Sequence, residues 1–160
     1  MNIEKYEVKR LDAVSYQFFS EGPRGKIVLR IIFTFDKNQF CNLCFGVWNQ
    51  ELGEIDDLVE IRNGDMDRLL TTVGQLTIDF LMSNPRLYVF ATGSSAARTR
   101  KYQMGINQNL EYIRERHQVL GFVANKVIRT GDDVETTGSE GEWYVFQKGI
   151  NYDGFLIYLK

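Results

Sequence analysis

The chain has few of the residues that mark exported, membrane-spanning or metal-binding proteins. Its 160 residues include two cysteines, two prolines and one histidine. The apolar segments on either side of Arg30 are short, whereas a helix needs roughly 20 apolar residues to span a bilayer. The first ten residues carry several charges and no apolar run, which is not the pattern of a signal peptide. We therefore expect a cytoplasmic protein that contacts no membrane.

The shortage of cysteine and histidine also argues against metal and nucleophilic sites. Cys41 and Cys44 are three residues apart in a predicted strand, so their side chains point to opposite faces. A structural zinc site needs four ligands. His117 is predicted at a helix C-terminus, where a protonated imidazole interacts favourably with the helix dipole. We expect two reduced cysteines that behave as small buried hydrophobic residues, no metal, no cofactor and no catalytic triad.

The overall charge of the chain is also small. The formal net charge is −2, so no strong field draws the chain to nucleic acid or to an anionic membrane. The composition, 44% hydrophobic, 13% aromatic and 25% charged, is that of a globular protein. Because the chain has the length of one ordinary domain and shows no repeat or linker, we predict a single α+β domain over residues 1–160. Any anion site must be local.

The first half of the chain is predicted to form strands followed by a helix. Aromatic and β-branched residues predict strands at 16–20, 26–35 and 40–48, with a further short strand at 58–61. Apolar residues then recur at steps of three and four from Met66 to Phe80, which predicts a helix. Asn63 or Asp65 can cap its start, and Pro85 ends it.

The second half is predicted to alternate strands with a second helix. Strands are expected at 86–92, 118–123, 143–146 and 155–159, and the polar, glycine-rich segment 125–142 is expected to be a loop. The helix begins at Ser94 or Ser95 and carries the apolar stripe Tyr102, Ile106, Leu110 and Ile113. This order predicts an α+β fold. Its mixed, mainly antiparallel sheet is built as a β-meander, helix, strand, helix and strands, with two main helices.

The most informative stretch lies where a predicted strand meets the second helix. Gly93 allows the backbone to turn, and Ser94 and Ser95 place hydroxyls beside the free N–H groups of the helix start. Arg98 and Arg100 follow in the first turns and add further donors. This combination is typical of an anion site, so these five residues are candidate ligand-binding residues.

Arg98 and Arg100 point to different sides of this helix, because successive helical residues are about 100° apart. Arg98 shares the apolar stripe of the helix, so its guanidinium needs a partner. That partner is either a bound anion or a carboxylate of the protein, with Asp65, Asp79 and the acidic residues between Glu54 and Glu60 as candidates. An internal ion pair is the more conservative interpretation, and both stay open at this point.

Two further groups of residues are better explained by structure than by function. The acidic residues before the first helix have the chemistry to bind Mg²⁺ or to transfer protons, but such a charge run is typical of a solvated turn. The aromatic residues of the first strands resemble a platform that stacks bases, but few basic residues lie between them, so core packing explains them better. The two groups are Glu54, Asp56, Asp57 and Glu60, and Phe18, Phe19, Phe33, Phe35, Phe40, Phe45 and Trp48.

Four motifs of the sequence are specific enough to indicate a family. They are Asn63-Gly64-Asp65, Leu70-Thr71-Thr72-Val73, the segment from Ala91 to Tyr102, and Gly149-Ile150-Asn151-Tyr152-Asp153-Gly154-Phe155. The sequence resembles an uncharacterised bacterial family, a small domain of unknown function, and the resemblance covers most of the chain. It implies membership of a family and no activity.

The predicted order of elements is similar to that of the GNAT N-acetyltransferase superfamily. That resemblance implies a loop of the pattern [R/Q]-x-x-G-x-[G/A], which cradles the pyrophosphate of acetyl-coenzyme A. The corresponding residues here are 62–67, which makes Asn63 and Gly64 further candidate ligand-binding residues. Asp65 and Asp67 replace the small residues of that pattern, and their carboxylates would repel a pyrophosphate. The resemblance therefore implies a GNAT-like fold with poor binding of coenzyme A.

Three classes of function are compatible with these features. A non-catalytic binding or regulatory domain, as in antitoxin, immunity or defence accessory proteins, best fits the small size and the absence of a catalytic constellation. The second class is a divergent GNAT-like acyltransferase or another enzyme with a phosphate-bearing ligand. The third is nucleic-acid binding through the cations from Arg98 to Arg116, which the net charge disfavours. The expected partner is a protein or a small anionic ligand, and the sequence identifies neither.

Overall fold

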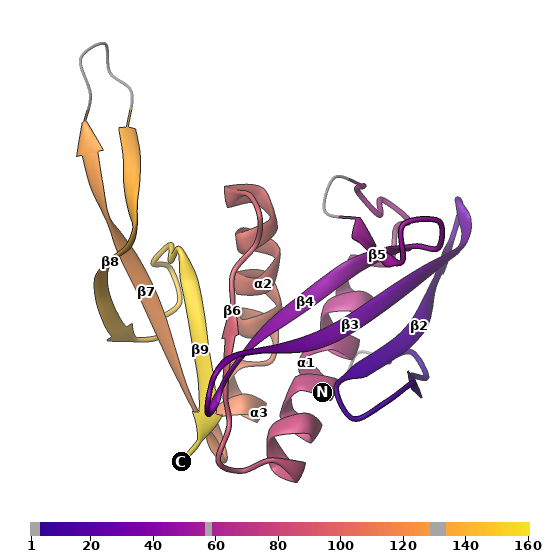
Figure 1. The fold of residues 1–160 in the computed structure, drawn as a ribbon, viewed down its shortest axis with the longest axis horizontal. Helices are drawn as coiled ribbons and strands as arrows, with labels where there is room; N and C mark the ends of the chain where they lie inside the picture. Colours follow the sequence, from indigo (N-terminus) through magenta and orange to yellow (C-terminus); the bar gives the residue numbers. More distant parts are fainter. Residues whose placement is uncertain (1–3, 57–58, 129–133) are drawn as a thin grey trace.

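A computed structural model gives the fold of the chain and describes residues 4–56, 59–128 and 134–160. Within these residues it contains nine strands and three helices (Figure 1). The strands form one mixed, mostly antiparallel sheet with the order β1-β2-β3-β4-β6-β9-β7-β8, and β5 pairs with β4 beside this path. The predicted fold class, α+β with a mainly antiparallel mixed sheet, is therefore confirmed.

The N-terminal half of the sheet is an antiparallel meander. It consists of β1 (Lys9–Arg10), β2 (Ser15–Gly22), β3 (Gly25–Lys37), β4 (Phe40–Asn49) and β5 (Glu54–Asp56). The short strand predicted at 58–61 is wrong for residues 59–61, and residues 57 and 58 lie outside the described residues. Gly53, with a φ of 65°, reverses the chain early enough to place β5 opposite the end of β4.

Three helices follow the meander and pack on one face of the sheet. They are α1 (Met66–Ser83), α2 (Ala96–Gln108) and α3 (Leu110–Arg114), with β6 (Tyr88–Ala91) between α1 and α2. The predicted second helix is therefore interrupted at Asn109, whose side chain donates to the Gly105 carbonyl. The predicted stripe still packs inward, because Ile106, Leu110 and Ile113 are all buried. No helix of the described residues is long and apolar enough to cross a membrane.

The C-terminal half consists of β7 (His117–Ile128), β8 (Val134–Val145) and β9 (Gly154–Leu159), and β9 lies between β6 and β7. The loop predicted at 125–142 is wrong, because β7 and β8 pair as a hairpin through most of that segment. Residues 129–133 lie outside the described part. β8 is an edge strand of the described sheet and pairs with β7 alone. A strand in this position can contain polar residues and glycines and still form a backbone ladder.

The core lies between one face of the sheet and the helices. Leu29, Ile31 and Phe33 alternate along β3 toward this face and are at most 1% exposed. The Phe33 ring stacks on Phe80 of α1, with ring centroids 3.9 Å apart. The residues that alternate with these core residues along the strands point to the opposite face of the sheet, which we call the outer face.

The two cysteines lie on opposite faces of β4, as predicted, and both are free thiols. Cys41 is buried, and its Sγ donates to the Tyr88 carbonyl at 3.5 Å. Burial raises the pKa of the Cys41 thiol to about 11, so the thiol is protonated at neutral pH. Cys44 lies on the outer face beside the Thr34 hydroxyl. The prediction that both cysteines are buried holds for Cys41, whereas Cys44 is only half-buried.

His117 is not at a helix end, and the prediction of a protonated imidazole there is wrong. It is the first residue of β7 and is 1% exposed. Burial lowers the pKa of its imidazole, and the nearby charges of Arg116 and Lys160 lower it further. Its Nε2 has no hydrogen-bond partner among the described residues, which also disfavours the protonated ring, because that form would bury an unpaired N–H donor.

Candidate functional site

The sheet opens where two parallel strands separate. β4 and β6 pair only through Phe40–Asn42 and Tyr88–Phe90, and they then diverge (Figure 1). Farther along the same edge, β4 pairs with β5 from Val47 onward. On this edge of β4, the ladder with β6 therefore ends at Asn42 and the ladder with β5 begins at Val47. This opening is the most distinctive feature of the sheet.

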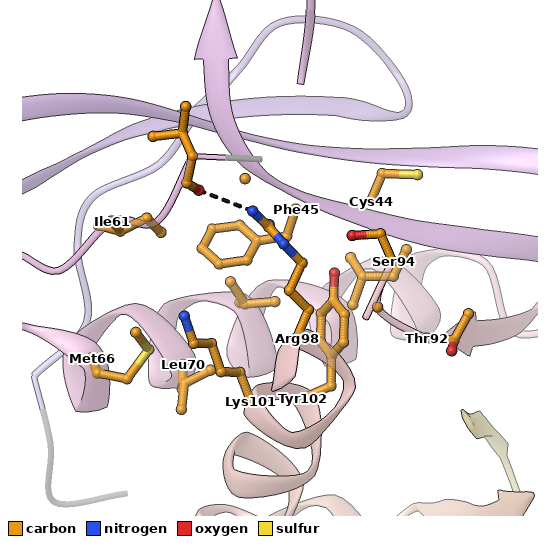
Figure 2. A pocket seen from close by; sticks show the side chains of 15 residues that line it. Cys44, Phe45, Ile61, Met66, Leu70, Thr92, Ser94, Arg98, Lys101 and Tyr102 are labelled. Carbon is orange, nitrogen blue, oxygen red and sulfur yellow. Dashed lines mark hydrogen bonds between the residues drawn. The ribbon is translucent and has the colours of Figure 1, made fainter. Parts of the chain in front are cut away.

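A cavity of about 310 Å³ fills the opening between β4 and the start of α2. Its walls come from β4, the segment before α1, α1 itself, the turn after β6 and the first turns of α2 (Figure 2). The surface is mostly apolar and includes Leu43, Phe45, Ile61, Leu70 and Val73. A mainly apolar concavity of this size is typical of a small-molecule site.

The only charged residues that line this cavity, among the described residues, are Arg98 and Lys101. Arg98 Nη2 donates to the Val59 carbonyl at 3.0 Å (Figure 2). A single backbone carbonyl satisfies one of the five guanidinium donors and leaves the charge unneutralised. The cavity therefore combines an apolar surface with positive charge on one side.

The ion pair predicted for Arg98 is not found among the described residues. Asp65 instead accepts hydrogen bonds from the hydroxyls of Tyr6 and Ser20, both at 2.6 Å. Asp79 accepts from the Gln75 amide, and Glu60 pairs with Arg62. Asp57, another member of the predicted acidic cluster, lies outside the described residues. Within the described residues, a backbone acceptor has replaced the predicted carboxylate.

The turn before α2 is closed by its own hydrogen bonds. The Ser95 hydroxyl accepts from the Arg98 N–H at 3.3 Å, which confirms Ser95 as the N-cap. The Gly93 N–H donates to Thr99 Oγ1 at 2.9 Å. A Cβ on Gly93 would lie 2.5 Å from the Arg98 Cβ, so this tight turn requires glycine. Ser94, Thr92 and Tyr102 are the hydroxyl-bearing residues at the cavity, and the Thr92 hydroxyl donates to the Asp153 carbonyl (Figure 2).

The structure therefore divides the predicted anion site between two hollows. Gly93, Ser94 and Arg98 line the cavity described above. Arg100 is exposed and lines a separate hollow of about 580 Å³ on the other side of the helix start, which Gly93, Ser94 and Ser95 also reach. The predicted difference in direction between Arg98 and Arg100 is confirmed.

Asn63 and Gly64 line neither hollow. Asn63 is buried, and its side chain accepts from the Arg24 N–H at 2.7 Å and donates to Ser20 Oγ and the Gly25 carbonyl. These bonds fasten the β2–β3 turn to the segment before α1. Gly64 has a φ of 73°, which fits the turn before the helix. Asp65 holds the N-cap position of α1 without a side-chain capping bond, because its carboxylate faces Tyr6 and Ser20.

The cations proposed for nucleic-acid binding do not share one surface. Arg98 and Lys101 face the cavity, whereas Arg100 faces the second hollow. Arg114 donates to the Phe146 carbonyl. The arrangement lacks the continuous basic stripe that binds a phosphate backbone.

Sequence reasoning missed two parts of the cavity. Lys101 lies three residues after Arg98, a spacing that puts both side chains on adjoining parts of one helix surface, and this spacing could have predicted its place. Residues 43–46 of β4 gave no such signal, because their exposure depends on where β5 and β6 stop pairing.

No group of three or more histidine, cysteine, aspartate or glutamate side chains in the described residues could hold a metal ion. No curated protein and no solved structure matches the chain, so the resemblance to the GNAT superfamily is not confirmed. A family model does match residues 2–160, and its description is a family of unknown function. Since this match covers almost the whole sequence and bears out the predicted membership of an uncharacterised family, the chain belongs to DUF6934.

Proposed function

We propose that this domain binds a small amphipathic anion, a molecule with an apolar body and one carboxylate or phosphate group, in the cavity between β4 and α2. The observation that carries the proposal is the combination of a mostly apolar lining with two cations, Arg98 and Lys101, and no lining carboxylate among the described residues. The apolar body would lie against Leu43, Phe45 and Leu70. The anionic group would accept hydrogen bonds from Arg98 and Ser94.

Both the apolar body and the anionic group of such a ligand would contribute to the binding free energy. Apolar surface gains roughly 25 cal/mol per Å² when it leaves water, so an apolar body supplies affinity in such a cavity. A hydrogen bond to a charged group contributes about 1.5–3 kcal/mol, which is enough to select anions over neutral molecules of the same shape. Arg98 is already held by Val59, so part of the entropy cost of ordering its side chain is met before the ligand arrives.

The lining supports a binding function more than a catalytic one. It includes no carboxylate and no imidazole among the described residues, and these are the usual proton acceptors at neutral pH. Cys44 also lines the cavity, but its Sγ lies 3.9 Å from the Thr34 hydroxyl on the outer face of β4. A non-catalytic binding domain is therefore the function that this geometry supports best.

Isothermal titration calorimetry with paired probes tests the proposal. Phenyl phosphate and hexanoate are the anionic probes, and benzyl alcohol and hexanol are their neutral counterparts. We expect at least one anionic probe to bind and its neutral counterpart to bind at least about tenfold more weakly. Equal binding of both members of each pair, or no binding at millimolar concentration, would contradict the proposal.

The matched variants Arg98→Ala and Arg100→Ala locate the site. Both remove one arginine from the same helix, but only Arg98 lines the proposed cavity. We expect Arg98→Ala to weaken anion binding by at least about tenfold and Arg100→Ala to change it by less than about twofold. If the two variants lose affinity equally, the anion does not bind in this cavity.

A divergent acyltransferase is the second candidate function. The observation that favours it is the divergence of two parallel strands, β4 and β6, which pair only through Phe40–Asn42 and Tyr88–Phe90. Asp67, exposed in the first turn of α1, argues against it because a carboxylate there repels a pyrophosphate. We expect calorimetry to detect no binding of acetyl-coenzyme A. Micromolar affinity would make the acyltransferase the leading candidate.

A further inference from the structure

The outer face of the sheet is apolar across five adjacent strands. Along β6, Val89 and Ala91 point to the helices, so Tyr88 and Phe90 point outward. The register places Tyr158 beside Tyr88 and Leu156 beside Phe90. It continues the first row to Phe40 on β4 and the second to Leu120 on β7 and Val145 on β8, and a third row pairs Phe122 with Trp143. We call the resulting surface the outer patch. It consists of Phe40, Tyr88, Phe90, Leu120, Phe122, Trp143, Val145, Leu156 and Tyr158.

The aromatic side chains of the outer patch contact one another across the strands. Phe40 stacks on Tyr88 at 5.0 Å between ring centroids, and Tyr88 contacts Tyr158 at 4.9 Å. Trp143 contacts Phe122 of its own row at 5.0 Å and Phe90 of the second row at 6.0 Å. Phe90 reaches across β9 over Gly154, where an added Cβ would lie 3.1 Å from its ring. These contacts make the patch a continuous and ordered surface.

The outer patch remains accessible because the helices pack on the opposite face. Phe40 is 46% exposed, Trp143 42% and Val145 58%, and the other six side chains are half-buried. With a large side chain presenting about 150–250 Å² when free, the nine together leave roughly 500 Å² in contact with water. This value lies within the range of the largest apolar patch on a typical monomer, and such patches are often functional, so the outer patch is a candidate interaction surface.

We propose that the outer patch is the interface of a homodimer, in which two copies pack their sheets face to face about a two-fold axis. Two observations select a second copy as the partner. A two-fold interface places the patch against itself, so like charges would repel, and none of the nine side chains is charged. The exposed area also supplies most of the roughly 800 Å² per partner that a stable interface buries, and neighbouring polar residues such as Asn42 and Gln118 can form the rim.

The same observations count against other partners. Single-stranded nucleic acid stacks on aromatic platforms, but it also needs cations along its backbone, and the outer patch has none. A partner recognised by charge would have to reach Arg100 or Asp153, which line a hollow with Phe90 and Phe122 at one end of the patch. These alternatives become outcomes of the experiment below.

Sedimentation velocity of the full chain, over a concentration series from submicromolar to high micromolar, tests the homodimer. We expect the sedimenting species to change from the mass of one chain to that of two within this range. Val145→Glu, on the most exposed residue of the patch, should weaken the dimer by at least about tenfold, because the interface would then bury two like charges. Trp143→Glu should weaken it at least as much.

Leu52→Glu is the matched control, since Leu52 is 68% exposed in the turn after β4 and outside the patch. We expect this variant to dimerise like the parent chain. Thermal melting checks that each variant is folded, and Val145→Glu is the decisive variant if Trp143→Glu unfolds. A chain that stays monomeric at high micromolar concentration overturns the proposal. A dimer that tolerates both patch substitutions, or binding of a single-stranded oligonucleotide that Val145→Glu abolishes, overturns it as well.

Discussion

The two faces of the sheet are made by alternate residues of the same strands, and they differ in what covers them. Phe33 on β3 is 1% exposed beneath α1, whereas Phe40 at the start of β4 is 46% exposed on the outer face. Both rings stack on another aromatic ring. The difference teaches that ring–ring contacts along a strand do not show which face is the core. The position of the helices decides this, and it also decides how much each side chain contributes to stability.

The largest expected effect comes from truncating these two phenylalanines. Phe33→Ala should lower the free energy of unfolding by about 3–5 kcal/mol, because it leaves a cavity against Phe80 in the closed core. Phe40→Ala should cost less than about 1 kcal/mol, since half of that ring is already in water. Urea unfolding at submicromolar protein, where a dimer is dissociated, measures both. Comparable losses would show that the outer face is as constrained as the inner one.

Gly→Ala substitutions at two positions also compare the inner face with the outer face, because each adds a methyl group to one of them. A Cβ on Gly121 would lie 2.3–2.5 Å from the ring of Tyr152, which is buried in the core. A Cβ on Gly154 would lie 3.1 Å from Phe90, which can move toward solvent. We expect Gly121→Ala to lower stability by about 1–3 kcal/mol and Gly154→Ala by less than about 1 kcal/mol. A larger loss for Gly154→Ala in urea unfolding would contradict the assignment of faces.

His117, on the inner face, should make the free energy of unfolding depend on pH. Its folded pKa lies below the ordinary value of 6.5, so the unfolded chain binds more protons just below that pH. Stability should therefore be constant above about pH 6.5 and fall as the pH drops toward the folded pKa, by at most about 1.4 kcal/mol per pH unit. Unfolding curves between neutral pH and about pH 5, where most carboxyl groups are still ionised, measure this slope. His117→Gln should remove it, and a slope that survives the substitution belongs to another group.

The smallest expected effect concerns reactivity and not stability. Cys41 is buried with a pKa of about 11, whereas Cys44 is half-buried on the outer face. Iodoacetamide should therefore modify Cys44 at least about tenfold faster than Cys41 in the folded chain. Peptide mass spectrometry after timed labelling distinguishes the two residues. Equal modification rates of Cys41 and Cys44 in the folded chain would mean that the reagent reaches the inner face as readily as the outer face.

The sequence predicted the elements that have a strong local signal. The spacing from Met66 to Phe80 predicted α1, and Ser95 was a correct candidate for the cap of α2. The strands around Ile31 and Phe45 were placed to within a few residues. In each case the periodicity or the capping residue lies within a few residues of the element, so a single sequence is enough to predict that element.

The failures share a different cause, which is dependence on distant parts of the chain. The hairpin at 125–142 has little apolar alternation and so gave no strand signal, although its backbone forms the ladder between β7 and β8. His117 is buried by packing that its neighbours in sequence do not reveal. Arg98 bonds to the backbone of Val59, and a carbonyl acceptor is present at every residue and so leaves no mark in the sequence. The aromatic residues of the first strands were assigned together to the core, although Phe19, Phe35 and Phe40 are exposed.

The place of β9 in the sheet has a consequence for how the protein is made. This strand, residues 154–159, lies between β6 and β7 and is the only link between them in the described sheet. On a ribosome, the meander with α1 and the hairpin with α3 would both emerge before the strand that joins them. Until then, the facing edges of β6 and β7 have unpaired backbone groups that can pair with other chains. The emergence of β9 from the ribosome therefore completes the pairing of β6 and β7 and protects these two edges from other chains.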